Sequence, residues 1–309
     1  MTRCTICGQR EAFYRRVYSG ENLCVRCFVE SIEKKVRATI GKYKMFDIDD
    51  RIAVAVSGGK DSVSLLHLLA KIEKDFPKSS VCAVTVDEGI RGYRDQALEI
   101  AAENCANLGI AHIVVSFKEL YGYTMDEITE KTAREELTPC AYCGVLRRKA
   151  INIAGRRAAA AKIATAHTLD DEIQTFFLNI IHGDPLRTMR STFTSNFEDT
   201  WILPRVKPLC EVLERETALY AFVKKIEFQD MPCPYAGEAL RNDVRNMLNH
   251  LEAKHPGIKY TILNSLEKIR KATKWEERHV QFKECKLCGE PSSMEICQTC
   301  QMLKRLSML

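Results

Sequence analysis

Cysteines at regular spacing are the first sign of chemistry in this sequence. The 309-residue chain has 14 cysteines, and five pairs of them have two residues between the partners. Four thiolates from two such pairs can surround one metal ion as a tetrahedron, the geometry that zinc takes in structural sites. The spacing therefore predicts two structural zinc sites near the chain ends: Cys4, Cys7, Cys24 and Cys27 in the first, and Cys285, Cys288, Cys297 and Cys300 in the second.

The fifth pair, Cys140 and Cys143, has no second pair beside it, but Cys233 between two prolines offers a third thiolate. Three cysteines can hold a 4Fe–4S cluster and leave one iron open to a non-protein ligand. A third zinc ion, a redox dithiol and a purely structural role are the alternatives. The remaining cysteines are expected to be packing residues: Cys82, Cys105 and Cys210.

A second chemical feature is the turn from Ser57 to Ser62, which follows an apolar run and precedes a helical pattern. Gly58 and Gly59 leave backbone amides bare, and the start of a helix favours an anion, so the turn predicts a phosphate site. The order Ser-Gly-Gly-Lys-Asp-Ser differs from the Walker A motif. Asp61 inside such a loop is explained if it holds magnesium on the phosphates. The alternative is an ordinary strand–turn–helix with two glycines.

Alternating strands and helices must position these residues. Apolar runs at 52–56, 81–86, 111–116 and 163–167 predict buried strands, and helices are expected near 95–108, over 147–161 and after 170. Repeated βα units predict an α/β fold with a doubly wound parallel sheet. Ligands of such sheets lie beyond the carboxyl ends of the strands. We therefore expect Ser57–Ser62, Asp87–Gly89 and His167–Asp171 to converge on one site.

The expected organisation has four parts: an N-terminal zinc finger (1–30), a linker helix (31–50), a catalytic domain (51–280) and a C-terminal zinc finger (281–309). Further helices are predicted over 28–43, 211–223 and 239–252. The basic face of the first of these is either solvated surface or an RNA contact. The segment 184–196 is either a surface loop or a lid over the site.

Composition sets few limits on function. Lysine and arginine exceed aspartate and glutamate by five, which permits a nucleic-acid partner without requiring one. No apolar run is long enough to span a bilayer, and the N-terminus has no apolar signal core. We therefore expect a cytoplasmic protein without membrane contact, whose thiols stay reduced.

The motifs resemble those of a known group of enzymes. Ser57–Ser62 looks like the PP-loop of the ATP pyrophosphatases. The fingers at both ends, the three further cysteines and His167-Thr-Leu-Asp-Asp171 resemble the TtcA/TtuA family of tRNA thiolation enzymes. Val86–Arg94 and Cys143–Arg148 are similar to the branch that modifies the wobble uridine. One departure is Ala166-His167-Thr168, where the family usually has Gly-His-Asn.

The resemblance implies a HUP-type sheet, a homodimer, ATP with Mg²⁺, a tRNA substrate, and sulfur from a ubiquitin-like carrier or free sulfide. ATP would adenylate the uridine carbonyl oxygen and release pyrophosphate, because oxide itself leaves badly. Sulfur would then displace AMP at the ring carbon, supplied at an iron–sulfur cluster on Cys140, Cys143 and Cys233. A persulfide relay on the same cysteines is the alternative.

The resemblance also implies roles for single residues. Ser57, Gly58, Gly59 and Ser62 would hold the β,γ-phosphates, Lys60 would neutralise them, and Asp61 would bind Mg²⁺. Val86 and Asp87 would contact the adenine or the ribose of ATP, and Arg147 would lie near the reacting centre. Three further residues would bind the nucleotide, coordinate magnesium or transfer a proton: His167, Asp170 and Asp171. The alternative is that one of the two aspartates is simply the N-cap of its helix.

Two other functions are compatible with parts of the sequence. One is a PP-loop enzyme that joins an amine to RNA, but such an enzyme has no use for Cys140, Cys143 and Cys233. The other is a non-catalytic zinc-ribbon scaffold that binds RNA. Lys60, Asp61 and the downstream carboxylate pair argue against that scaffold.

Overall fold

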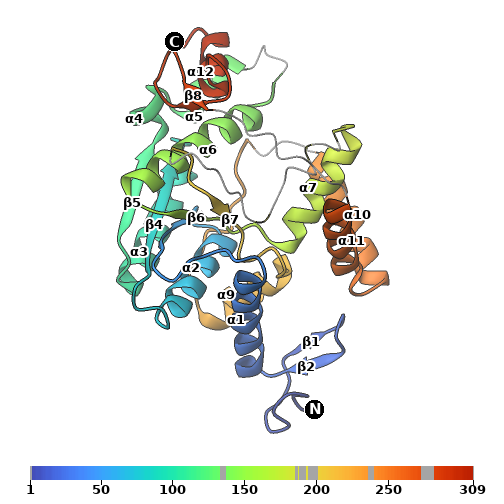
Figure 1. Cartoon of the computed structure of the whole chain (residues 1–309). Coiled ribbons are helices and arrows are strands. Elements are labelled where there is room, and N and C mark those ends of the chain that lie inside the picture. The colour runs from blue at the N-terminus through green and yellow to red at the C-terminus, as the bar shows by residue number, and fades with distance from the viewer. Residues whose placement is uncertain are drawn as a thin grey trace.

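The centre of the fold is a sheet of five parallel strands. The computed structural model describes residues 2–132, 137–184, 187, 193, 201–235, 240–272 and 282–308. The strands are neighbours in the order β5-β4-β3-β6-β7, so the chain builds outward from β3 in one direction and then in the other. Helices cover both faces (Figure 1), which confirms the predicted doubly wound α/β fold. The strand bounds are β3 Arg51–Ala55, β4 Ser80–Asp87, β5 His112–Ser116, β6 Lys162–Ala164 and β7 Arg205–Val206.

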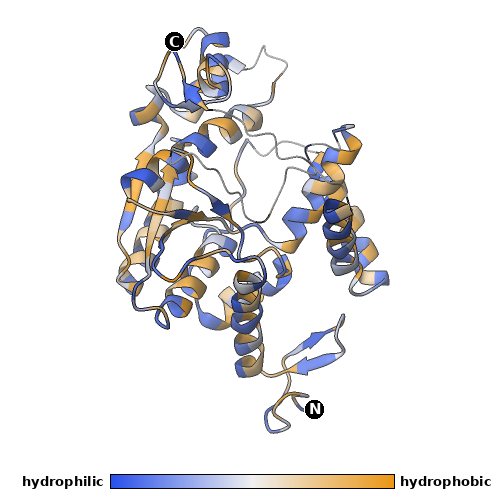
Figure 2. Cartoon of the chain, viewed as in Figure 1, coloured by the Kyte–Doolittle hydropathy of each residue, from blue (hydrophilic) through white to orange (hydrophobic). Residues whose placement is uncertain are grey.

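Two apolar cores lie on the opposite faces of this sheet. Ile52 and Val54 of β3 belong to one core, whereas Ala53 between them belongs to the other, together with Cys82 and Val84 of β4. Successive side chains of a strand point to opposite faces, so a strand buried on both sides needs a continuous apolar run. The strands are accordingly coloured largely as hydrophobic in Figure 2.

The helices divide between the two cores. The first core contains residues of α2 (Lys60–Glu73), α3 (Arg94–Leu108) and α9 (Glu214–Lys224). The second contains residues of α4 (Phe117–Tyr121), α5 (Met125–Thr132) and α6 (Pro139–Arg157). Beside the sheet, α10 (Leu240–Lys254) and α11 (Ile258–Ala272) pack against α7 (Leu169–Ile181), as Figure 1 shows.

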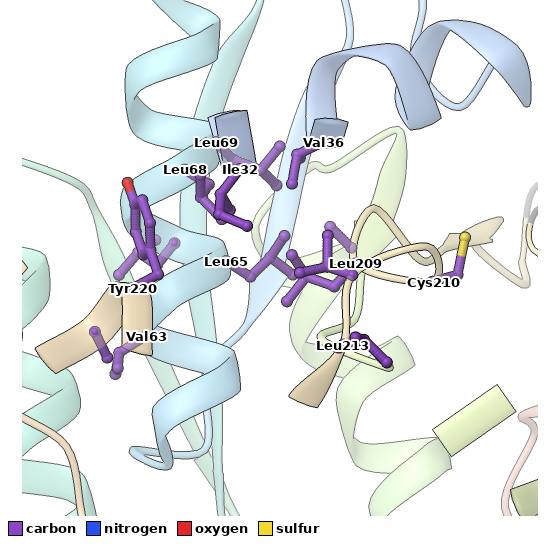
Figure 3. Close-up of a cluster of buried hydrophobic side chains, with 14 of the residues drawn as sticks. Ile32, Val36, Val63, Leu65, Leu68, Leu69, Leu209, Cys210, Leu213 and Tyr220 are labelled. Atoms are coloured by element: carbon purple, nitrogen blue, oxygen red, sulfur yellow. The ribbon is translucent and has the colours of Figure 1, made fainter. Parts of the chain in front are cut away.

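A small two-stranded ribbon and a helix lie at each end of the chain, and the two ends lie on opposite sides of the molecule (Figure 1). The first comprises β1 (Tyr14–Arg16), β2 (Glu21–Leu23) and α1 (Val25–Lys42), and the second β8 (Lys283–Glu284), β9 (Pro291–Ser292) and α12 (Gln298–Arg305). The helix expected as a linker does more than connect: Ile32 and Val36 of α1 are fully buried against Leu65 and its neighbours in α2 (Figure 3). Among the described residues, no helix has the length and hydropathy needed to cross a membrane.

Several boundaries differ from the prediction. The helix predicted over 147–161 begins at Pro139, because Thr138 in an extended conformation and a proline in the first turn start it earlier. The strand predicted over 163–167 ends at Ala164. The helices α4, α5 and α11 and the short strand β7 were not predicted. Of the segment 184–196, only residues 184, 187 and 193 are described, so the choice between a loop and a lid stays open.

Candidate active site

The turn between β3 and α2 is closely shaped by its own hydrogen bonds. The amide and the hydroxyl of Ser57 both donate to Ser62 Oγ at 3.1 Å, and Ser62 Oγ donates to the carbonyl of Gly59 at 2.8 Å. Gly58 has a φ of +87°, and a Cβ there would lie 2.6 Å from the carbonyl oxygen of Ala97. Only glycine fits this position. The turn therefore presents bare amides at the start of α2, as a phosphate site requires.

The charges of the loop are balanced by α9. Lys60 Nζ lies 2.9 Å from Asp61 Oδ2 and 2.8 Å from Glu214 Oε1, and Thr217 Oγ1 donates to Asp61 Oδ1. Burial opposes protonation of Lys60, but the two carboxylates more than offset it, so the pKa of Lys60 is raised. Burial also raises the pKa of Asp61, against the opposing effects of Lys60 and Thr217. Glu214 and Thr217 were not predicted as site residues, since no local pattern links α9 to the loop.

The predicted strand ends meet at one edge of the sheet. Asp87 is the last residue of β4, and His167 follows the end of β6 by three residues. Because β4 and β6 are the parallel neighbours of β3, their carboxyl ends lie beside Ser57–Ser62. Asp87 Oδ1 accepts from the amide of Gly89 at 2.8 Å, and His167 Nδ1 lies 2.9 Å from Thr165 Oγ1. The expected convergence is confirmed, whereas the nucleotide contacts of Val86, Asp87 and His167 stay predictions.

The two aspartates at the start of α7 are engaged by other parts of the chain. Asp170 is 5% exposed, pairs with Lys259 of α11 and accepts from the amide of Glu214 at 2.7 Å. Asp171 shares a capping box with Thr168, which is the N-cap. The alternative in which one aspartate is itself the N-cap is therefore wrong. The predicted roles of both aspartates with magnesium or a proton stay open, beside these structural contacts.

A chain of polar contacts, with a buried ion pair at its centre, connects the PP-loop with Cys143. Arg94 Nη1 donates to the carbonyl of Ser57 at 3.0 Å, and its Nε lies 2.7 Å from Glu88 Oε2. Glu88 Oε1 in turn lies 2.6 Å from Arg147 Nε, and Arg147 Nη2 lies 3.0 Å from Cys143 Sγ. The side chains of Glu88 and Arg94 are each 4% exposed. We call these three residues, Arg94, Glu88 and Arg147, the Glu88 bridge.

Arg94 also donates to the carbonyl of Val86 at 2.7 Å, so the bridge fixes the end of β4 as well. Burial opposes the charge of Arg147, but Glu88 and then Cys143 raise its pKa. Arg147 was predicted near the reacting centre. Glu88 and Arg94 lie in the stretch Val86–Arg94, on which the family resemblance rests. Their ion pairs were not predicted, because contacts between charged side chains from distant segments have no local pattern in a sequence.

The three cysteines outside the ribbons lie in one region, because Cys140 and Cys233 both affect the pKa of Cys143, but their sulfurs do not all lie within 4.8 Å of one another as those of each ribbon do. Cys140 and Cys143 lie in the first turns of α6, where the helix dipole favours negative charge. Cys140 Sγ lies 3.0 Å from the carbonyl of Tyr235, which follows Cys233 closely in the chain. Burial raises the pKa of Cys143 to about 11; Arg147 opposes this, whereas Cys233 and Cys140 add to it. The expected packing roles are confirmed for the last three cysteines, which are at most 1% exposed: Cys82, Cys105 and Cys210.

Each ribbon brings four cysteine sulfurs together. Within each set all Sγ atoms lie within 4.8 Å of one another, as ligands of one tetrahedral ion would. Burial opposes ionisation of Cys4 and Cys285, but backbone amides donated to their sulfurs more than compensate, so the pKa of each falls to about 6. The lowered pKa of these two thiols favours the thiolate that binds metal, whereas burial raises the pKa of Cys27, Cys297 and Cys300. The sets are those predicted: Cys4, Cys7, Cys24 and Cys27, and Cys285, Cys288, Cys297 and Cys300.

The second set is also contacted by a residue of α6. Lys149 of α6 places Nζ 3.0 Å from Cys288 Sγ and 3.7 Å from Cys297 Sγ. Four thiolates around a divalent ion would carry a net negative charge, which this ammonium would offset. The helix that carries Cys140 and Cys143 is thus tied to the C-terminal ribbon.

We expect Lys149→Met to weaken metal binding at the C-terminal ribbon by about 10- to 100-fold, as loss of an outer partner of metal ligands commonly does. A competition titration with a colorimetric zinc chelator measures this as one of two zinc equivalents released at a lower chelator concentration. Lys286→Met is the matched control, because Lys286 lies in the same ribbon, is 65% exposed and pairs with Glu295. Release of both equivalents at the wild-type concentration would show that Lys149 does not support the site.

Comparison with known proteins agrees with this arrangement. The family model for the PP-loop domain matches residues 29–252. The cytoplasmic tRNA 2-thiolation protein 1 of Chlamydomonas reinhardtii is 37% identical over 305 residues, which cover 98% of this chain and 85% of that protein. The tRNA 2-thiolation protein NcsA of Haloferax volcanii is 34% identical over 319 residues, covering 98% of both chains.

A solved structure is also similar over the whole chain. The U34-tRNA thiolase NcsA from Methanococcus maripaludis, determined with its 4Fe–4S cluster, is 32% identical and superposes with a TM-score of 0.84. The match covers 99% of this chain and 97% of that one. This chain therefore belongs to the PP-loop family of tRNA 2-thiolation proteins.

Proposed function

We propose that this protein is a tRNA thiolase, which replaces the 2-oxygen of the wobble uridine by sulfur while ATP is converted to AMP and pyrophosphate. The observation that supports this most is the Glu88 bridge. It joins a phosphate-binding turn to a cysteine that has no place in either ribbon. An enzyme that activates a carbonyl oxygen with ATP and then delivers sulfur to the carbon that carries this oxygen requires these two parts side by side. The relatives named for tRNA 2-thiolation agree with the proposal.

The chemistry divides between the two parts. The uridine O2 attacks the α-phosphorus of ATP, the bond to the bridging oxygen breaks, and pyrophosphate leaves. Sulfur then adds at C2 and AMP departs with the former O2, which leaves the C=S bond. The amides of the turn and Lys60 hold and neutralise the leaving phosphates, and Asp61 would hold Mg²⁺ beside them. Lys60 forms ion pairs with Asp61 and Glu214, which hold its ammonium group at the turn.

Cys140, Cys143 and Cys233 fit a three-cysteine iron–sulfur site. Cys140 and Cys143 lie at the start of α6, Cys233 lies near enough to affect the pKa of Cys143, and Arg147 places a permanent cation against Cys143. When bound, a 4Fe–4S cluster supplies one iron without a protein ligand, at which sulfide can be held. Burial raises the pKa of the Cys143 thiol, and the guanidinium of Arg147 opposes that effect. Both a metal ligand and a persulfide relay use the thiolate, so the raised pKa does not separate these two alternatives.

The remaining partners belong to the same proposal. Both ribbons would hold zinc, the sulfur would come from a ubiquitin-like carrier or free sulfide, and the protein would act in the cytoplasm as a homodimer. An amine-joining PP-loop enzyme would leave the three cysteines without a use. A non-catalytic scaffold would have no use for the cluster of Lys60, Asp61 and Glu214 at the turn.

The experiment is an anaerobic reaction of the metal-replete protein with tRNA, ATP, Mg²⁺ and sulfide, followed by mass spectrometry of the nucleosides and quantification of AMP. We expect 2-thiouridine at position 34 and one AMP for each thiolated tRNA. We expect Asp61→Ala to slow AMP formation by at least about 100-fold, as loss of a group that stabilises transition-state charge does, while tRNA binding is kept. An equal loss of tRNA binding would mean that the loop is only structural. Absence of AMP and 2-thiouridine from the wild-type reaction would refute the thiolase.

A further inference from the structure

A groove between α6 and α12 lies outside the parts described so far. Its volume is about 440 Å³, and its walls come from Cys140 and Arg148 on α6 and from Gln298 and Arg305 on α12, with Arg187 at its side. We call it the α6–α12 groove. The two helices pack against each other where the C-terminal ribbon meets the sheet domain (Figure 1).

The groove is strongly basic and carries no compensating charge. Arg148, Arg187 and Arg305 are all exposed, and no aspartate or glutamate is among its lining residues. Within the part of the chain that the structure describes, none of these three guanidinium groups forms an ion pair. Desolvation and then the charge of Arg187 lower the pKa of Arg148, as expected where like charges crowd together.

Elsewhere on the same helix, cations are paired. Arg147 pairs with Glu88, Arg156 with Glu290, and Arg157 with Glu119. Arg148 stands between these residues in sequence and is left without a carboxylate in the described chain. Like charges gathered without a counter-charge raise the energy of the folded protein, so their placement points to a ligand that supplies the negative charge.

The position of the groove identifies the class of ligand. Cys140 lines it, so a bound anion lies next to the three-cysteine site. Guanidinium groups match phosphate oxygens with paired donors, and exposed arginines on two different helices suit a chain of phosphates better than a single ion. Resting on the proposed function, we propose that the α6–α12 groove binds the phosphodiesters of the tRNA that flank the nucleotide to be thiolated. The C-terminal ribbon thereby helps to present the base.

The test measures binding of an anticodon stem–loop RNA with uridine at position 34 to the metal-replete double variant Arg148→Ala/Arg305→Ala across a range of salt concentrations. We expect binding about tenfold weaker and a plot of log K against log salt that is shallower by about 1 to 2, since each lost phosphate contact removes roughly 0.7 to 0.9 from the slope. Lys304→Ala is the matched control, because Lys304 is exposed on the same helix but does not line the groove. We expect it to keep the wild-type affinity and slope.

The outcomes distinguish a failure of the groove proposal from a failure of the proposed function. If the wild-type protein thiolates tRNA and the folded double variant binds the stem–loop with unchanged affinity and slope, the groove proposal is wrong and the proposed function stands. If the wild-type protein neither binds nor thiolates tRNA, the proposed function fails first. A further arm compares sodium phosphate with sodium chloride at equal ionic strength. Phosphate that binds to the wild type but not to the double variant, without displacing the RNA, would assign the groove to a free anion instead.

Discussion

Cys233→Ala is expected to abolish tRNA thiolation and iron binding while both ribbons keep their metal. Cys233 is the only member of the three-cysteine set that comes from outside α6, so without it the site would keep only two thiolates. Loss of even an outer partner of a metal ligand commonly costs 10- to 100-fold, and loss of a ligand itself should exceed about 100-fold. The ribbon sulfurs lie in separate clusters and share no ligand with this site.

The measurement combines three readouts on anaerobically purified protein: iron and acid-labile sulfide per chain, zinc per chain, and the rate of 2-thiouridine formation. Cys105→Ala is the control, since Cys105 is 1% exposed in the core and belongs to no metal set. A Cys233→Ala protein that thiolates at the parent rate would overturn the cluster hypothesis. Removal of iron by chelation, with the cysteines intact, distinguishes the alternatives: full activity without iron would favour a persulfide relay.

The parts of the site that sequence predicts are those with a local signature. A glycine turn after an apolar strand, and cysteines two residues apart, are short patterns whose geometry follows from the backbone alone. The meeting of Ser57, Asp87 and His167 follows from one further rule, that the ends of neighbouring parallel strands share an edge. For these residues, topology carries the prediction from local pattern to three-dimensional site.

The missed residues act through side chains that reach across the fold. Glu214 and Thr217 reach the PP-loop from α9, and Lys259 reaches Asp170 from α11. A charge on an amphipathic helix looks the same in a sequence whether it faces solvent or a buried partner. The early start of α6 is a different case, because Thr138 before Pro139 is a recognisable helix start. That local signal is sufficient to place Cys140 and Cys143 on the helix.

The Glu88 bridge is the missed feature with the largest expected effect. We expect Glu88→Ala to lower the free energy of unfolding by about 3 to 5 kcal/mol, the usual result of removing one partner of a buried ion pair. The substitution leaves the guanidinium of Arg94, with a side chain only 4% exposed, without its carboxylate, and releases Arg147 from its position beside Cys143. Urea unfolding of the metal-free protein measures the change without any contribution from bound metal. Glu103→Ala, at an exposed position of α3, should shift stability by no more than about 0.5 kcal/mol.

A purely structural role and a role in positioning the site predict different results for Glu88→Gln. The amide keeps the shape of the side chain and can still accept from one arginine, so most of the stability should return. It cannot balance two guanidinium groups, so Arg147 should move relative to Cys143. We therefore expect Glu88→Gln to fold with near-wild-type stability, yet to bind iron more weakly and to thiolate more slowly than wild type. Wild-type iron affinity and thiolation in a stable Glu88→Gln protein would limit the bridge to stability. Because Arg94 contacts Ser57 and Arg147 contacts Cys143, a loss of both nucleotide and iron affinity would instead identify Glu88 as the link that holds the two halves of the site together.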